Sequence, residues 1–109
     1  MKLIKCIIRP NKVDEVRDAL EKASVSGMTI TEVRGHGRQK GHKAVYRGRE
    51  YDVSLLPKTM IEMAVSDELV DEVIDLVMKT ARTGDIGDGR IWVLGIEEGY
   101  NIRTAARDI

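Results

Sequence analysis

The sequence of 109 residues contains no phenylalanine, one tryptophan, two prolines and one cysteine. A single cysteine excludes an internal disulfide, and because Cys6 lies in an apolar run we expect a buried, inert thiol. No apolar run approaches the roughly 20 residues that span a bilayer. The first residues also form no continuous apolar segment of the kind found in secretory signals. We therefore expect a cytoplasmic protein that does not insert into a membrane.

The chain also has no excess of charge, because 18 Lys and Arg residues balance 18 Asp and Glu residues. A neutral protein has no long-range field that would hold it on nucleic acid or on an anionic membrane. We expect no nucleic-acid partner, and any anion that the protein binds must meet a local site. The length and a hydrophobic content of 42% fit one compact domain over residues 1–109.

Apolar patterning predicts four strands. Residues 3–8 form a β-branched apolar run that Pro10 ends, and we interpret this run as a strand buried on both faces. Residues 28–33 alternate apolar and polar side chains, as a half-buried strand does. Residues 60–65 and 91–94 predict the third and fourth strands.

Two segments with apolar residues at helical spacing predict amphipathic helices. The first covers residues 13–23, and the second covers residues 66–81 and is followed by Gly84, which is placed to take a left-handed capping conformation. The element order is β-α-β-β-α-β. With right-handed crossovers, this order predicts an α+β, ferredoxin-like sandwich in which two helices cover an antiparallel sheet.

Two glycine-rich segments are the main candidates for a binding site. Residues 35–57, between the second and third strands, show no sustained periodicity, and a long exposed loop of this kind in a small domain is usually functional or a linker. Residues 83–89 precede the last strand. Backbone N–H groups that approach a phosphate need torsions that glycine adopts at low cost. Either segment alone is equally compatible with a plain turn, but together they favour polyphosphate binding because four arginines accompany them. These are Arg38, Arg82, Arg90 and Arg103.

Three parts of the chain carry recognisable motifs. They are Gly35-x-Gly37-Arg38-Gln39-Lys40-Gly41-His42 with Tyr46-Arg47-Gly48-x-Glu50-Tyr51, then Thr83-Gly84-x-Ile86-Gly87-Asp88-Gly89-Arg90-Ile91, and finally Ile102-Arg103-Thr104. In sequence and spacing these motifs resemble the T-loop, the B-loop and the C-terminal loop of the PII family of signal-transduction proteins. The resemblance covers nearly the whole chain and sets the three loops at about residues 37–55, 82–90 and 97–109.

The resemblance implies a homotrimer that binds ATP or ADP in clefts between subunits and has no catalytic activity. Gly87, Asp88, Gly89 and Arg90 would then face the phosphates, and Arg103 would reach across from a neighbouring subunit. Thr29 and Ala64 would line the adenine and ribose, Gly37, Arg38 and Gln39 would form the base of the T-loop, and Asn101 would complete the nucleotide site.

The resemblance also implies a 2-oxoglutarate site at the base of the T-loop, formed by Gln39, Lys40, Gly41 and Lys58. Gln39 would help to hold a Mg²⁺ ion that bridges ATP and 2-oxoglutarate, and Lys58 would pair with an effector carboxylate. Effector binding would shift the T-loop conformation and so change its affinity for targets such as an ammonium transporter or a metabolic enzyme. Tyr51 matches a tyrosine that is uridylylated in some members.

Two positions depart from the family pattern. Asn101 stands where an arginine is usual and Asp85 where a lysine is common, so both changes remove positive charge. A lost charge-assisted hydrogen bond corresponds to roughly ten- to a hundredfold weaker ATP binding. The alternative within the family is therefore a specialised sensor of ADP, AMP or another small anion such as bicarbonate, without a 2-oxoglutarate response.

Two other classes of protein fit the sequence less well. An RNA-recognition motif has the same element order, but it stacks bases on aromatic residues of its central strands, and this chain has no phenylalanine. An enzyme that turns over its nucleotide needs a positioned base or nucleophile. Only His42 and Asp88 are candidates, and both lie in loops that ligand and partner binding explain equally well.

Overall fold

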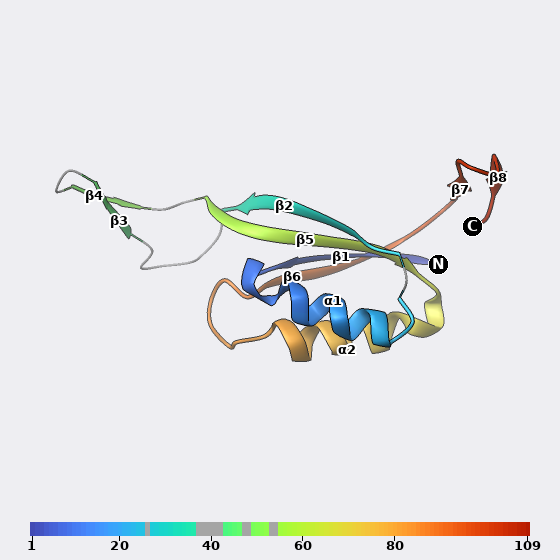
Figure 1. The fold of residues 1–109 in the computed structure, drawn as a ribbon, viewed down its shortest axis with the longest axis horizontal. Helices are drawn as coiled ribbons and strands as arrows, with labels where there is room; N and C mark the ends of the chain where they lie inside the picture. Colours follow the sequence, from blue (N-terminus) through green and yellow to red (C-terminus); the bar gives the residue numbers. More distant parts are fainter. Residues whose placement is uncertain (26, 37–42, 47–48, 53–54) are drawn as a thin grey trace.

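The computed structural model describes residues 1–25, 27–36, 43–46, 49–52 and 55–109. Two short 3₁₀ turns, η1 (Pro10–Lys12) and η2 (Asp67–Leu69), lead into the two helices. In chain order the elements of Figure 1 are β1 (Lys2–Ile8), α1 (Val13–Lys22), β2 (Thr29–Gly35), β3 (Lys43–Tyr46), β4 (Arg49–Asp52), β5 (Leu56–Val65), α2 (Val70–Ala81), β6 (Gly89–Gly95), β7 (Tyr100–Asn101) and β8 (Ala106–Arg107).

The main sheet has the strand order β2-β5-β1-β6, and every neighbouring pair is antiparallel. Both helices lie on one face of this sheet (Figure 1). This arrangement confirms the predicted α+β, ferredoxin-like fold, with a long connection between β2 and β5. Among the described residues, neither helix has the length and the apolar character needed to cross a bilayer.

The hydrophobic core lies between the sheet and the two helices. Alternate residues of β1 and β5 point towards the helices and are buried, as Ile4 and Ile61 are. Leu20 from α1 and Val73 from α2 pack against them. Cys6 belongs to the same core, and burial raises the pKa of its thiol to about 11. The prediction of a buried, inert cysteine is therefore confirmed.

The other face of the sheet is open in the described chain, so the prediction that residues 3–8 are buried on both faces is wrong for the single chain. Leu3 and Ile7 point to this face and are only half-buried. Trp92 and Leu94 of β6 lie on the same face, and 46% and 44% of their surface is exposed. The sequence misled because an apolar residue on an outer face has the same pattern as one in a core. Burial in the core of the single chain therefore does not account for the apolar side chains on this face.

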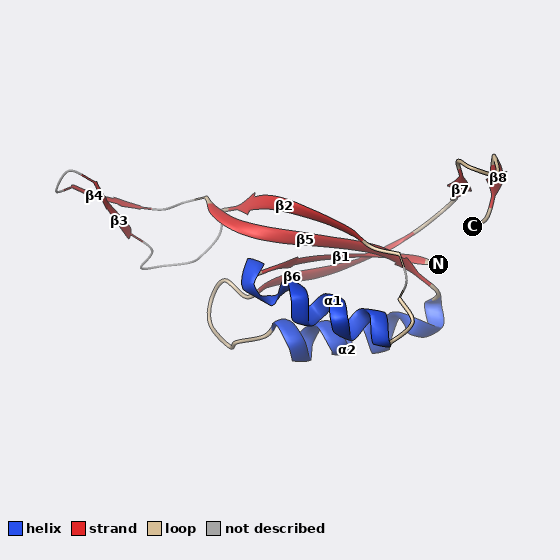
Figure 2. Ribbon diagram, in the orientation of Figure 1, coloured by secondary structure: helices blue, strands red, loops and turns tan. Residues whose placement is uncertain are grey.

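Two short hairpins were not predicted (Figure 2). Strands β3 and β4 pair with each other inside the segment that was predicted to have no strands, and β7 pairs with β8 near the C-terminus. Strands of two to four residues are too short for periodicity to reveal. Strand β5 also begins earlier than predicted, with Pro57 close to its start, where a missing N–H group is tolerated.

Candidate functional site

The loop of residues 82–88 connects α2 to β6 and depends on glycine. Gly84, Gly87 and Gly89 have φ values of 95°, 106° and 110°, in the left-handed region that other residues rarely adopt. At Gly89 a Cβ atom would lie 1.7 Å from the carbonyl oxygen of Ile7. A side chain at this position would therefore collide with the backbone of β1.

Asp88 organises this loop from within. Its Oδ2 atom accepts hydrogen bonds from the backbone N–H groups of Thr83 and Gly84 at 2.9 and 2.8 Å. Its Oδ1 atom accepts from the Thr83 hydroxyl and, at 3.0 Å, from Nε of Arg9. Burial opposes ionisation, but the hydrogen bonds from Thr83, Gly84 and Arg9 outweigh it and hold the pKa of Asp88 far below its usual range. Direct contact of Asp88 with a phosphate stays a prediction.

Arg9 is a residue of this site that the sequence analysis missed. The register pairs Ile8 with Gly89, so Arg9 follows β1 opposite Asp88. Its Nη2 atom also donates a hydrogen bond to the carbonyl oxygen of Ile86 at 3.1 Å. One signal was available: in a ferredoxin-like fold the first and last strands are neighbours, so a charged residue just after the first strand faces the loop before the last.

Lys58 on β5 contacts the same loop. Its Nζ atom donates a hydrogen bond to the carbonyl oxygen of Gly87. Burial and the nearby charge of Arg9 lower the pKa of Lys58, and the charge of Asp88 partly offsets them. Two cations, Arg9 just after β1 and Lys58 on β5, thus contact three successive loop residues, Ile86, Gly87 and Asp88.

A cavity of about 630 Å³ lies between this loop and the ends of β2 and β5. Arg34, Lys58 and Arg90 provide cationic groups in its lining, and Gly87 and Gly89 provide backbone. Trp92 lines it as well, with its ring centroid 5.8 Å from the guanidinium carbon of Arg90. Cationic side chains beside exposed glycine backbone suit a polyphosphate, so the described residues fit the phosphate groups of a nucleotide.

The residues predicted to line adenine and ribose lie elsewhere in the chain. Thr29 and Ala64 line a separate cavity of about 470 Å³ together with Glu62. Ala64 is six residues from Lys58 along β5, which corresponds to roughly 20 Å of extended strand. One chain therefore does not bring the two predicted halves of the nucleotide site together.

The C-terminal residues of the predicted site belong to the β7–β8 hairpin, which stands apart from the loop of residues 82–88 (Figure 1). The Oδ1 atom of Asn101 accepts a hydrogen bond from the backbone N–H of Thr104 at 3.1 Å. Arg103 lies in this turn and is exposed. The side chain of Asn101 is thus occupied in shaping the turn that carries Arg103.

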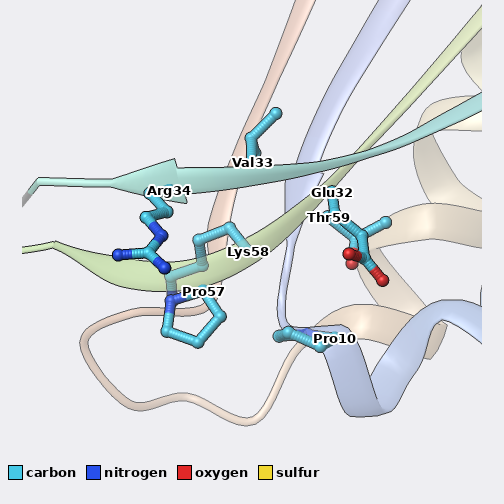
Figure 3. Close-up of a pocket in the computed structure, with 7 residues that line it drawn as sticks. All are labelled: Pro10, Glu32, Val33, Arg34, Pro57, Lys58 and Thr59. Carbon is cyan, nitrogen blue, oxygen red and sulfur yellow. The ribbon is translucent and has the colours of Figure 1, made fainter.

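A further cavity of about 440 Å³ adjoins Lys58 on the side of the sheet that carries Pro10. Figure 3 shows Arg34 and Lys58 close to Pro57, and Glu32 beside Thr59. Lys58 therefore lines two cavities, while its ammonium group donates a hydrogen bond to the Gly87 carbonyl oxygen.

The remaining predicted positions are described only in part or not at all. Tyr51 lies in β4 opposite Ala44, and only its backbone is described. The other predicted positions lie outside the described residues, and they include the predicted Mg²⁺ position. These are Gly37, Arg38, Gln39, Lys40, Gly41 and the alternative catalytic candidate His42.

The fold and the glycine loop with its cations define a small ferredoxin-like protein with a candidate phosphate site, and comparison with known proteins identifies its family. The family model described as "Nitrogen regulatory protein P-II" matches residues 1–106, and the chain belongs to this family, which confirms the resemblance. The P-II 2 protein of Methanothermobacter thermautotrophicus is 57% identical over 104 residues, which cover 95% of this chain and 90% of that protein.

Two further relatives show the same relationship over nearly the full length of both chains. The nitrogen regulatory protein P-II of Rhizobium etli is 52% identical over 108 residues, which cover 99% of this chain and 96% of that protein. The nitrogen regulatory protein GlnK of Escherichia coli K12 is 51% identical with the same coverage. All three relatives are named as regulatory proteins.

Proposed function

We propose that this protein is a nitrogen regulatory signal-transduction protein that binds ATP or ADP together with 2-oxoglutarate and controls target proteins through its T-loop. Membership of the P-II family supports the regulatory role. The observation that carries the ligand proposal is the loop of residues 82–88 with Gly89, in which three glycines take positive φ beside Arg90 and Lys58. We propose that the protein acts in the cytoplasm and catalyses no reaction.

Each ligand would be held by a distinct part of the chain. Gly87, Gly89 and Arg90 would bind the phosphates, and Lys58 would pair with a carboxylate of 2-oxoglutarate. The T-loop base would complete the effector site with Gln39, Lys40 and Gly41. A Mg²⁺ ion would supply positive charge shared between the phosphates and the effector.

A homotrimer would account for two features of the single chain. The sheet face opposite the helices exposes Trp92 and Leu94, and burial of such side chains stabilises subunit association. The cavity with Thr29 and Ala64 lies at the other end of β5 from the phosphate loop, so one ligand would contact both only where two chains meet. In a closed ring of identical chains the same junction recurs at every interface.

A second candidate function rests on Asn101 and Asp85. Asn101 is uncharged and its amide oxygen is engaged with Thr104, so Arg103 is the charged residue that this turn would offer to a phosphate. Asp85 adds negative charge to the phosphate loop itself. Both features favour nucleotides with fewer phosphates, as expected of a specialised ADP or AMP sensor.

The effector part of the proposal is tested with Gln39→Ala. We expect this substitution to abolish binding of 2-oxoglutarate in the presence of Mg²⁺ and ATP, while ADP affinity changes by less than about threefold. Isothermal titration measures both. Full effector affinity in Gln39→Ala would show that the effector site is assigned wrongly.

A further inference from the structure

We propose that Arg9 is a positioning residue of the nucleotide site that fixes the loop of residues 82–88 and neutralises Asp88 beside the phosphates. The inference rests on the proposed function where nucleotides serve as the readout. Its basis is the pair of contacts from one guanidinium, 3.0 Å to the Asp88 carboxylate and 3.1 Å to the Ile86 carbonyl oxygen.

The backbone of Arg9 is held in a defined conformation, so its side chain starts from a fixed position. Arg9 follows the last residue of β1, and Pro10 restricts it to an extended conformation, seen in its φ of −65° and ψ of 140°. Its carbonyl oxygen accepts a hydrogen bond from the N–H of Lys12 at 3.0 Å. About one fifth of the side-chain surface of Arg9, and of Asp88, is exposed. The ion pair is thus anchored at the strand end and partly shielded from water.

The two contacts suit arginine in particular. Nε reaches Asp88 while Nη2 reaches Ile86, so one planar group joins two residues of the loop. A lysine ammonium is a single point charge and does not reproduce this fork. Lys58 holds the intervening residue through the Gly87 carbonyl oxygen. The loop conformation therefore depends on side chains from β5 and from the end of β1.

Neutralisation of Asp88 follows from its place in the sequence. Asp88 lies between Gly87 and Gly89, which both line the cavity of about 630 Å³. An unpaired carboxylate here would repel phosphate groups, and the repulsion would grow with the charge of the ligand. Arg9 supplies the compensating positive charge, so loss of Arg9 should matter most for ATP and least for AMP.

The experiment compares Arg9→Gln, Arg9→Gln with Asp88→Asn, and Arg9→Lys by isothermal titration with ATP, ADP and AMP. Arg9→Gln should weaken ATP binding by roughly ten- to a hundredfold and AMP binding by less than about threefold, with ADP between them. The double variant Arg9→Gln with Asp88→Asn also lacks the carboxylate. Its ratio of ATP affinity to AMP affinity should be within about threefold of the ratio in the unsubstituted protein. Arg9→Lys keeps the positive charge. Any loss of affinity in this variant should therefore be the same for ATP, ADP and AMP.

Arg17→Gln is the matched control, because Arg17 also pairs with an aspartate, Asp14, but on the exposed surface of α1. It should leave all three affinities unchanged. Equal losses of ATP, ADP and AMP affinity in Arg9→Gln, or no loss, would overturn the proposal.

Amide hydrogen exchange separates failure of this inference from failure of the proposed function. The backbone N–H groups of Thr83 and Gly84 donate hydrogen bonds to Asp88. Their exchange should be at least roughly tenfold faster in Arg9→Gln and in Arg9→Lys than in Arg17→Gln. This readout needs no ligand, so it holds even if the protein binds no adenylate. Unchanged exchange rates in both Arg9 variants would overturn the positioning role, and Arg9→Lys carries the test if Arg9→Gln does not fold.

Discussion

At Gly89 the fold and the candidate site depend on one close approach between backbones. The φ of 110° and the distance of 1.7 Å from a Cβ position to the Ile7 carbonyl oxygen both require glycine. The same residue begins β6 and lines the proposed phosphate cavity. A change here should therefore affect stability and ligand binding together.

We expect Gly89→Ala to lower the free energy of unfolding by about 1–3 kcal/mol, because β1 or the loop must move to admit the methyl group. Urea denaturation measures this loss. Gly95→Ala, at the other end of the same strand, is the control, since the nearest atom to its Cβ position is the Lys2 ammonium at 3.9 Å. Similar losses in the two variants would contradict the assignment.

Because the Asp88 carboxylate is hydrogen-bonded in the folded protein, we expect the stability of the protein to depend on pH. Its pKa is depressed in the folded protein, so its stabilising contribution is complete above the unfolded pKa of about 4 and is lost as the pH falls below it. We expect Asp88→Asn to be less stable than the unsubstituted protein at pH 7, and the difference to shrink towards pH 2. Thermal melts across this range measure it.

Asp14→Asn serves as the control for that experiment, because the Asp14 side chain is 85% exposed in its ion pair with Arg17 and such pairs contribute little. A difference between Asp88→Asn and the unsubstituted protein that stays constant down to pH 2 would contradict the role given to the Asp88 carboxylate.

Among the elements, the β3–β4 hairpin forms a sheet separate from the main one. Its two strands pair with each other and with no other described strand. We expect replacement of residues 43–52 by a short glycine linker to leave the melting temperature within about 4 °C and adenylate affinity within about threefold. Binding of a T-loop target should be lost.

Differential scanning calorimetry and titration with ADP test this separation of fold from T-loop. A shortened protein that melts far below the full chain, or one that no longer binds ADP, would show that the hairpin belongs to the folding unit.

Elements with long, regular patterns were predictable from the sequence, and the short ones were not. Helix α2 has enough apolar periodicity, and strand β1 a long enough apolar run, to define the type of element and its approximate position. The fold followed from the order of such elements. The four-residue strands β3 and β4 gave no periodic signal. In the site, the glycine motif around Gly87 is visible in the sequence, whereas the contact of Arg9 with Asp88 depends on the pairing of β1 with β6, which no local motif reveals.

On the scale of the whole molecule, the open sheet face predicts association. Leu94 lies on that face opposite Leu3, and 44% of its surface is exposed in the single chain. We expect the protein to have three times the 12.2 kDa mass of the chain, and Leu94→Lys to dissociate it because a charge buried in the interface is costly. Light scattering coupled to size exclusion measures both masses.

Met78→Lys is the matched control, because Met78 is similarly exposed, at 51%, on helix α2. It should leave the mass unchanged. A monomeric unsubstituted protein, or equal behaviour of the two variants, would contradict the role of the open face.

The most direct test of the central claim is isothermal titration of the purified protein with ATP, ADP and AMP, with the ATP titration repeated in the presence of Mg²⁺ and 2-oxoglutarate. We predict saturable ATP binding that 2-oxoglutarate tightens. Preferential ADP or AMP binding without a 2-oxoglutarate response would favour the specialised sensor instead, and the absence of any adenylate binding would contradict the account.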